Sequence, residues 1–83
     1  MSHTPHELAA DFPDHVDLMH KLRETDAHFV KMADSYHTLN RAVHRAESDV
    51  EPTSDDHLQQ MRRDRVALKD EIYAYLTRNA ASA

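Results

Sequence analysis

Apolar residues in the middle of the chain follow the spacing of a coiled-coil helix. After Ala27 they recur at alternating intervals of three and four residues, at Phe29, Met32, Tyr36, Leu39, Val43 and Ala46. This spacing places them on one face of an α-helix, because such a helix turns once in about 3.6 residues. The pattern predicts a helix over residues 27–47.

A second stripe with the same spacing begins after a predicted turn. Pro52 cannot continue a helix, whereas Ser54 is a favourable N-cap and Asp55 opens a first turn that favours acids. The stripe comprises Leu58, Met61, Arg65, Leu68, Ile72 and Tyr75. It predicts a helix over about residues 55–78 and a frayed tail at 80–83.

A shorter apolar pattern precedes these two stripes. Pro13 suits the first position of a helix, where its missing N–H costs nothing. Apolar residues follow at helical spacing, at Phe12, Val16, Met19 and Leu22. They predict a short helix over about residues 13–24. Thr25 or Asp26 can cap a new helix, so residues 13–47 form either one kinked helix or two.

These elements predict an all-α fold. Two heptad stripes joined by a short loop are typical of an antiparallel, coiled-coil-like hairpin of two helices, here preceded by a short N-terminal helix. Folding the chain about the loop pairs Phe29 with Tyr75. One helical-hairpin domain over residues 12–79 follows, since residues 1–11 show no periodicity and are predicted to be a flexible arm.

The last predicted helix carries a second apolar stripe, which the hairpin itself leaves uncovered. Val66, Tyr73 and Leu76 form this stripe. Either the short N-terminal helix or a second copy of the protein can bury it, because a two-helix hairpin cannot cover both faces. We therefore expect Val66, Tyr73 and Leu76 to form an interaction surface, and the protein to be a homo-oligomer.

Composition narrows the function classes. Cysteine and glycine are both absent, which removes disulfides, thiolate zinc sites and Gly-rich phosphate loops. No secretory signal and no long apolar run occurs, so we expect a cytoplasmic protein with no membrane segment. Two packed helices offer no enclosed cavity in which catalytic pKa values are shifted, so we expect no enzyme and no cofactor.

A cluster of three arginines in the last predicted helix favours nucleic-acid binding, since arginine binds phosphate in a bidentate fork. The cluster consists of Arg62, Arg63 and Arg65. The net charge of −5 opposes it. Arg65 falls in the predicted seam as its one charged residue. We expect it to stack on Tyr36 or Leu68, or to pair with an acid from another chain.

Eight histidines are many for a chain of 83 residues. On the two long predicted helices no pair has the spacing of helical zinc ligands, which is three or four residues. The candidate metal ligands are His44 and His57, which can approach across the predicted loop. Histidine-based metal binding or pH sensing is therefore an alternative function.

The run FPDHVDLMHKLRETDAHFVKMADSYHTLNRAVHRAE and the later LKDEIYAYL resemble the YdcH-like family of small bacterial proteins. The resemblance covers the chain from Phe12 to about Leu76. It implies a helical hairpin in the bacterial cytoplasm, often with coiled-coil character. It implies no catalytic or ligand-binding residues, and the molecular function of the family is undefined.

The combined expectation is a small, non-enzymatic helical interaction module. It self-associates and binds an unidentified protein partner, through Val66, Tyr73 and Leu76 or through the acidic N-terminal helix. Metal or pH sensing by histidines is the alternative, and nucleic-acid binding through the arginines of the last helix comes third.

Overall fold

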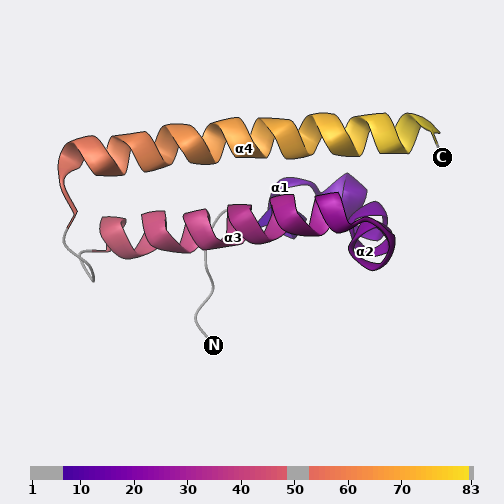
Figure 1. Ribbon diagram of the computed structural model, residues 1–83, viewed down its shortest axis with the longest axis horizontal. Helices are drawn as coiled ribbons and strands as arrows, with labels where there is room; N and C mark the ends of the chain where they lie inside the picture. The colour runs from indigo at the N-terminus through magenta and orange to yellow at the C-terminus, as the bar shows by residue number, and fades with distance from the viewer. Residues whose placement is uncertain (1–6, 49–52, 83) are drawn as a thin grey trace.

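The computed structural model describes residues 7–48 and 53–82, apart from the side chain of Ser82. In these ranges the chain forms α1 (Leu8–Asp11), the short 3-10 helix η1 (Pro13–His15), α2 (Val16–Thr25), α3 (Ala27–Glu47) and α4 (Asp55–Ser82), and no strand. The all-α prediction is confirmed. Figure 1 shows α3 and α4 side by side and running in opposite directions, as expected for an antiparallel hairpin.

Two side-chain caps define where the long helices begin. Asp26 lies between α2 and α3 in an extended conformation, and its Oδ1 accepts a hydrogen bond of 3.1 Å from the backbone N–H of Phe29. Ser54 precedes α4, and its Oγ accepts one of 3.2 Å from the N–H of His57. Each cap satisfies a backbone donor that has no partner within its helix. Residues 13–47 therefore form separate helices, with α3 starting after Asp26.

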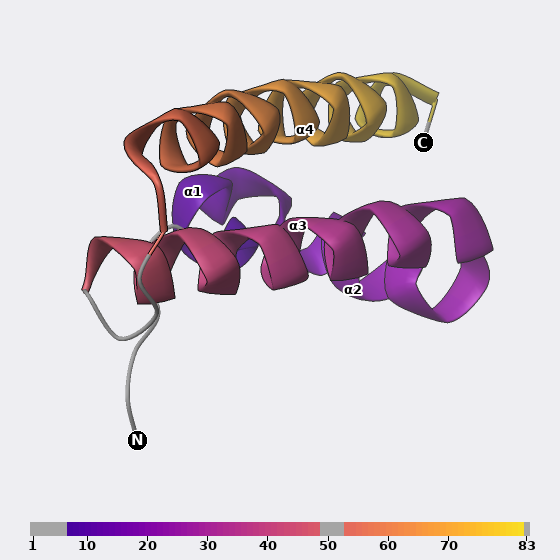
Figure 2. The ribbon, with the colours of Figure 1, turned by 60° about the vertical axis from the view of Figure 1, so that its left-hand side comes forward.

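The N-terminal elements form a second layer at one end of the hairpin. Figure 1 looks nearly along α2 while α3 and α4 run across the view, so α2 crosses the hairpin steeply. Figure 2 shows α2 against the end where α3 begins and α4 ends, with α1 nearer the middle. The packing follows from the predicted apolar stripe, since Phe12, Met19 and Leu22 are all buried.

Two predictions about the chain ends are wrong within the described residues. Of the residues 1–11 predicted to be a flexible arm, Leu8–Asp11 form α1, and Leu8 is only 4% exposed and packs into the core. The tail predicted to fray from residue 80 continues α4 as far as Ser82. Asn79 supports this extension by donating a 2.8 Å hydrogen bond to the carbonyl oxygen of Tyr75, and alanines, which favour helices, follow it. Residues 1–6 and 83 lie outside the described residues.

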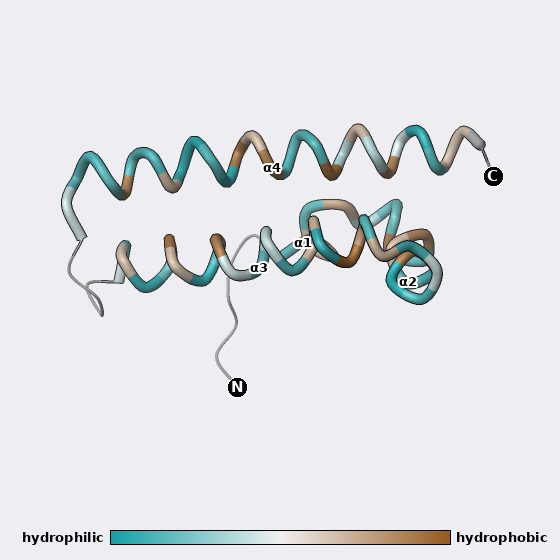
Figure 3. The backbone as a smooth tube through the Cα atoms, in the orientation of Figure 1, coloured by the Kyte–Doolittle hydropathy of each residue, from teal (hydrophilic) through white to brown (hydrophobic). Residues whose placement is uncertain are grey.

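The hydrophobic core is divided into two clusters. Figure 3 shows hydrophobic positions on the facing sides of α3 and α4 and hydrophilic ones on their outer sides. The larger cluster joins the N-terminal layer to both long helices and contains Leu8, Phe12, Met19, Leu22, Phe29, Met32, Ala33, Tyr36, Ile72 and Leu76. The smaller cluster contains Val43, Ala46 and Met61. The half of the hairpin near its loop is thus held by α3 and α4 alone among the described elements.

The predicted register of the hairpin is observed at Phe29 and Tyr75. Their rings are stacked with centroids 6.5 Å apart. None of the helices in the described ranges has the length and hydropathy that a membrane-spanning segment requires.

Candidate functional site

The predicted interaction surface is only partly available. Val66 is 58% exposed and Tyr73 is 52% exposed, but Leu76 is completely buried. Leu76 belongs to the same cluster as Leu8 and Phe12, so the N-terminal layer covers it. Of the two covers that the sequence left open for this stripe, the N-terminal elements are the one that buries Leu76, so Leu76 does not belong to an exposed surface. We call the remaining pair, Val66 and Tyr73, the outer face of α4.

Tyr73 is held in place although half of it is exposed. Its ring stacks on Phe12 with centroids 5.7 Å apart and an angle of 23° between planes. The ring of His15 meets it edge-on at 6.4 Å. Offset stacking and edge contacts are the favoured geometries for aromatic pairs. Tyr73 is therefore anchored to the N-terminal layer on one side while about half of the side chain remains exposed.

Arg65 binds a residue of its own chain. Its Nη1 donates a 3.1 Å hydrogen bond to Oδ1 of Asn40, which is only 1% exposed. Asn40 is a partner that the sequence analysis did not name, and the charge of Arg65 also acts on the hydroxyl of Tyr36, one of the predicted neighbours. The apolar stripe did not include Asn40, because Asn40 is polar and the stripe was assigned to its neighbour Leu39. Its position four residues after Tyr36 and three before Val43 is the signal that places it in the seam.

The other two arginines of the cluster have separate partners. Nε and Nη2 of Arg62 lie 3.1 and 2.7 Å from Oε2 of Glu47. This contact joins the end of α3 to the beginning of α4. Nη2 of Arg63 donates to the side chain of Gln60 at 3.0 Å. The three arginines thus have three separate partners, two of them on α3 and one on α4, and present no shared phosphate-binding fork.

Asp11 connects α1 to both long helices. Its Oδ2 accepts a hydrogen bond from the Tyr36 hydroxyl at 3.4 Å and lies 3.3 Å from Nζ of Lys69. Burial, together with the negative charge of Asp11, raises the pKa of Tyr36 to about 12. No signal in the sequence pointed to this connection, because residues 1–11 showed no periodicity.

Asp26 links the start of α3 to α4. The hydroxyl of Tyr75 donates to Oδ2 of Asp26, while Oδ1 caps α3. The hydrogen bond from Tyr75, and then that from the N–H of Phe29, lower the pKa of Asp26 because they favour its charged form. The same bond raises the pKa of Tyr75, since it favours the protonated phenol.

The candidate metal ligands His44 and His57 are both exposed, on α3 and α4. Within residues 7–48 and 53–82, no group of three or more histidines, cysteines or acids is arranged to hold a metal ion. The geometry around His44 and His57 therefore adds no support to metal binding. Two others of the eight histidines, His3 and His6, lie outside the described residues.

The comparisons with known proteins agree with the resemblance noted above. Neither a search of curated proteins nor one of solved structures finds a significant match. Residues 29–76 match a family described as "Protein of unknown function (DUF465)", which includes the YdcH-like proteins. The match spans the facing stripes of α3 and α4, including Asn40 and Arg65, and covers more than half of the sequence. The chain therefore belongs to the DUF465 family.

Proposed function

We propose that this protein is a small, non-enzymatic helical interaction module that self-associates through the outer face of α4. The observation that supports the proposal is the exposure of Val66 and Tyr73, the large hydrophobic side chains that stand out from the surface of the described residues. Burying apolar surface contributes roughly 25 cal/mol for each Å² removed from water. Covering both side chains would therefore favour association.

A second copy of the chain is the occupant that we propose for this face. Val66 and Tyr73 are seven residues apart, about two turns or roughly 10 Å along α4. If two α4 helices pack antiparallel about a two-fold axis, Val66 of each copy meets Tyr73 of the other. Each large apolar side chain then has an apolar partner.

The charges between these two positions fit the same arrangement. The proposed two-fold axis passes between Lys69 and Asp70, so Lys69 of one copy approaches Asp70 of the other. Opposite charges in this position favour the antiparallel pairing over a parallel one, in which like side chains would face each other. Lys69 is also 3.3 Å from Asp11 of its own chain, so this charge is shared between two acids.

The anchoring of Tyr73 lowers the entropic cost of association. A side chain that loses rotamer freedom on binding costs about 0.5–1.5 kcal/mol. The stacking of Tyr73 on Phe12 restricts its ring before any partner arrives. The same preorganised face would accept an amphipathic helix of another protein in the cytoplasm, which is our proposal for the partner.

Self-association is tested by light scattering coupled to size-exclusion chromatography at tens of micromolar. We expect a dimer for the natural sequence and a monomer for Val66→Glu. Ala67→Glu is the matched control, because Ala67 is exposed on α4 but points about 100° away from Val66. A monomeric natural protein, or equal dissociation by both variants, would contradict the proposal.

The orientation is tested by disulfide cross-linking, which is clean because the chain has no cysteine of its own. Val66→Cys and Tyr73→Cys variants are mixed and oxidised. Antiparallel packing predicts that the cross-link between the two different variants forms faster than either self-cross-link. Preferential self-cross-linking of each variant would contradict the antiparallel arrangement.

A further inference from the structure

The N-terminal layer and α3 line a partly open pocket of about 170 Å³ that the proposed function does not use. One part of its wall is apolar, formed by Leu8, Val16, Met19 and Phe29. The polar part is formed by Glu7, His20, Arg23 and His37. A cavity of about 150 Å³ is large enough for benzene, so this pocket can hold a compact ligand of similar size.

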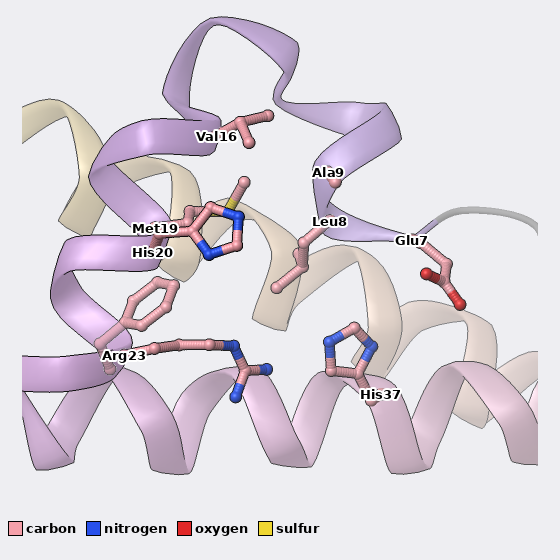
Figure 4. Close-up of a pocket in the computed structure, with 9 residues that line it drawn as sticks. Glu7, Leu8, Ala9, Val16, Met19, His20, Arg23 and His37 are labelled. Atoms are coloured by element: carbon pink, nitrogen blue, oxygen red, sulfur yellow. The ribbon is translucent and has the colours of Figure 1, made fainter.

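Three of the polar groups lie along one side of the pocket, and His20 lies beside Met19 on another wall (Figure 4). Figure 4 shows the guanidinium of Arg23 extending toward the imidazole of His37, with the carboxylate of Glu7 beyond His37 at the far end. Arg23 comes from α2 and His37 from α3, so the two donors reach the pocket from different helices. Two convergent donors beside an apolar wall are typical of sites for small amphiphilic anions.

Arg23 is available to a ligand. Its Nη1 lies 3.7 Å from Oδ1 of Asp34, and the side chains of Arg23 and Asp34 are 42% and 65% exposed. A surface ion pair of this kind contributes little energy, so a ligand can compete for the guanidinium. Burial, and then the charge of Arg23, lower the pKa of His37. A neutral imidazole still donates one hydrogen bond.

We propose that this pocket binds a small monocarboxylate with a compact apolar body. The carboxylate lies at Arg23 and His37, and the apolar body lies against Leu8, Met19 and Phe29. The site is separate from the outer face of α4, so it stands independently of the proposed self-association. A ligand of about ten heavy atoms held by one ionic contact is expected to bind with a dissociation constant on the order of 1 mM.

The test is a titration of the isotope-labelled full chain with sodium benzoate, followed by backbone amide NMR at constant ionic strength. We expect saturable shifts in α1, α2 and the first half of α3. Benzamide, the neutral counterpart, should bind about tenfold more weakly or worse, because it lacks the charge-assisted contact with Arg23. Equal binding of benzoate and benzamide would overturn the proposal.

A second titration, with N-acetyl-leucine as a stand-in for the carboxyl end of a peptide, distinguishes that ligand from a free small acid. Binding of benzoate alone assigns the site to a free small acid, and binding of both assigns it to a carboxylate in either setting. Binding of neither overturns the proposal. Val66→Glu should leave the benzoate affinity unchanged, so failure of self-association and failure of this site are distinguishable.

Three variants locate the binding site. Arg23→Met should weaken benzoate binding about tenfold, whereas Arg63→Met on the surface of α4 is the matched control and should not change it. Glu7→Gln should strengthen binding severalfold, because it removes a negative charge from the far end of the pocket. A gain of affinity cannot result from misfolding. If Glu7→Gln weakens binding, or both arginine variants weaken it equally, the proposal is wrong.

Discussion

Asn40 of α3 accepts a hydrogen bond of 3.1 Å from the Arg65 guanidinium of α4, and Asn40 is almost completely buried. The pair lies in the seam between the two long helices. It separates the larger hydrophobic cluster, which includes Tyr36, from the smaller one, which includes Val43. A polar pair at such a point allows one register of the helices, since any shift would leave a buried amide without its partner.

Asn40→Ala is expected to lower the free energy of unfolding by about 2 kcal/mol, because it removes a buried hydrogen-bonding group opposite Arg65. Urea unfolding followed by circular dichroism measures the change. Thr38→Ala, at an exposed position of α3, is the control and should change stability by less than about 0.5 kcal/mol. Similar losses in both variants would show that the Asn40–Arg65 contact contributes nothing specific.

Replacing Asn40 and Arg65 together by leucine tests the register argument. An apolar pair restores most of the stability lost in Asn40→Ala, since no polar group remains buried. We expect this double variant to lose the single register of the hairpin, seen as broadened or doubled amide signals by NMR. One sharp set of signals would mean that apolar packing alone determines the register.

Leu76→Ala is expected to destabilise the protein by about 2–5 kcal/mol, because the side chain is completely buried against the N-terminal layer. Val66→Ala should cost less than about 0.5 kcal/mol, since Val66 is exposed. Chemical unfolding of dilute samples, in which association does not contribute, compares the two variants. A small effect of Leu76→Ala would place Leu76 on the surface after all.

Asp11→Asn is expected to loosen α1, because its carboxylate contacts Tyr36 and Lys69. The partly exposed pair with Lys69 contributes about 1 kcal/mol or less, so the global stability changes little. Hydrogen exchange should accelerate at the amides of α1 but not in α4. Asp14→Asn, on the exposed start of η1, is the control, and no difference between the variants would remove the proposed role of Asp11.

The contacts of Asp26 in the folded state predict that the protein loses stability in acid. Its pKa is lowered on folding, so the unfolded chain binds the proton more tightly than the native one. The stabilisation is complete above the ordinary pKa of 3.8 and is lost as the pH falls through the lower folded value. Thermal unfolding from pH 6 to pH 2 should therefore show a smaller acid-dependent decrease for Asp26→Asn, which keeps an N-cap side chain.

Tyr75→Phe separates the contribution of the hydroxyl from that of the ring. It keeps the stacking on Phe29 but removes the hydrogen bond to Asp26. The pKa of the Asp26 carboxyl, measured by NMR titration, should move back toward its ordinary value. An unchanged pKa would attribute the shift to the backbone N–H of Phe29 instead.

The sequence alone determined the elements of this fold that depend on local spacing. Heptad stripes predicted both long helices, since apolar residues three and four apart share one face. The cap Ser54 was also predicted, and Asp26 was one of two candidates for the other cap, because an N-cap acts on amides within the next turn. The pairing of Phe29 with Tyr75 followed from loop length and helical rise.

Only the tertiary structure decided what covers these helices. Leu76 is buried because Leu8 and Phe12 pack in the same cluster, and α1 is too short to leave a periodic signal. The partner of Arg65 is the buried amide of Asn40, on another helix and 25 positions away in the chain. Contacts of this kind depend on how helices cross and not on spacing within any one of them, so the pattern of the sequence does not contain them.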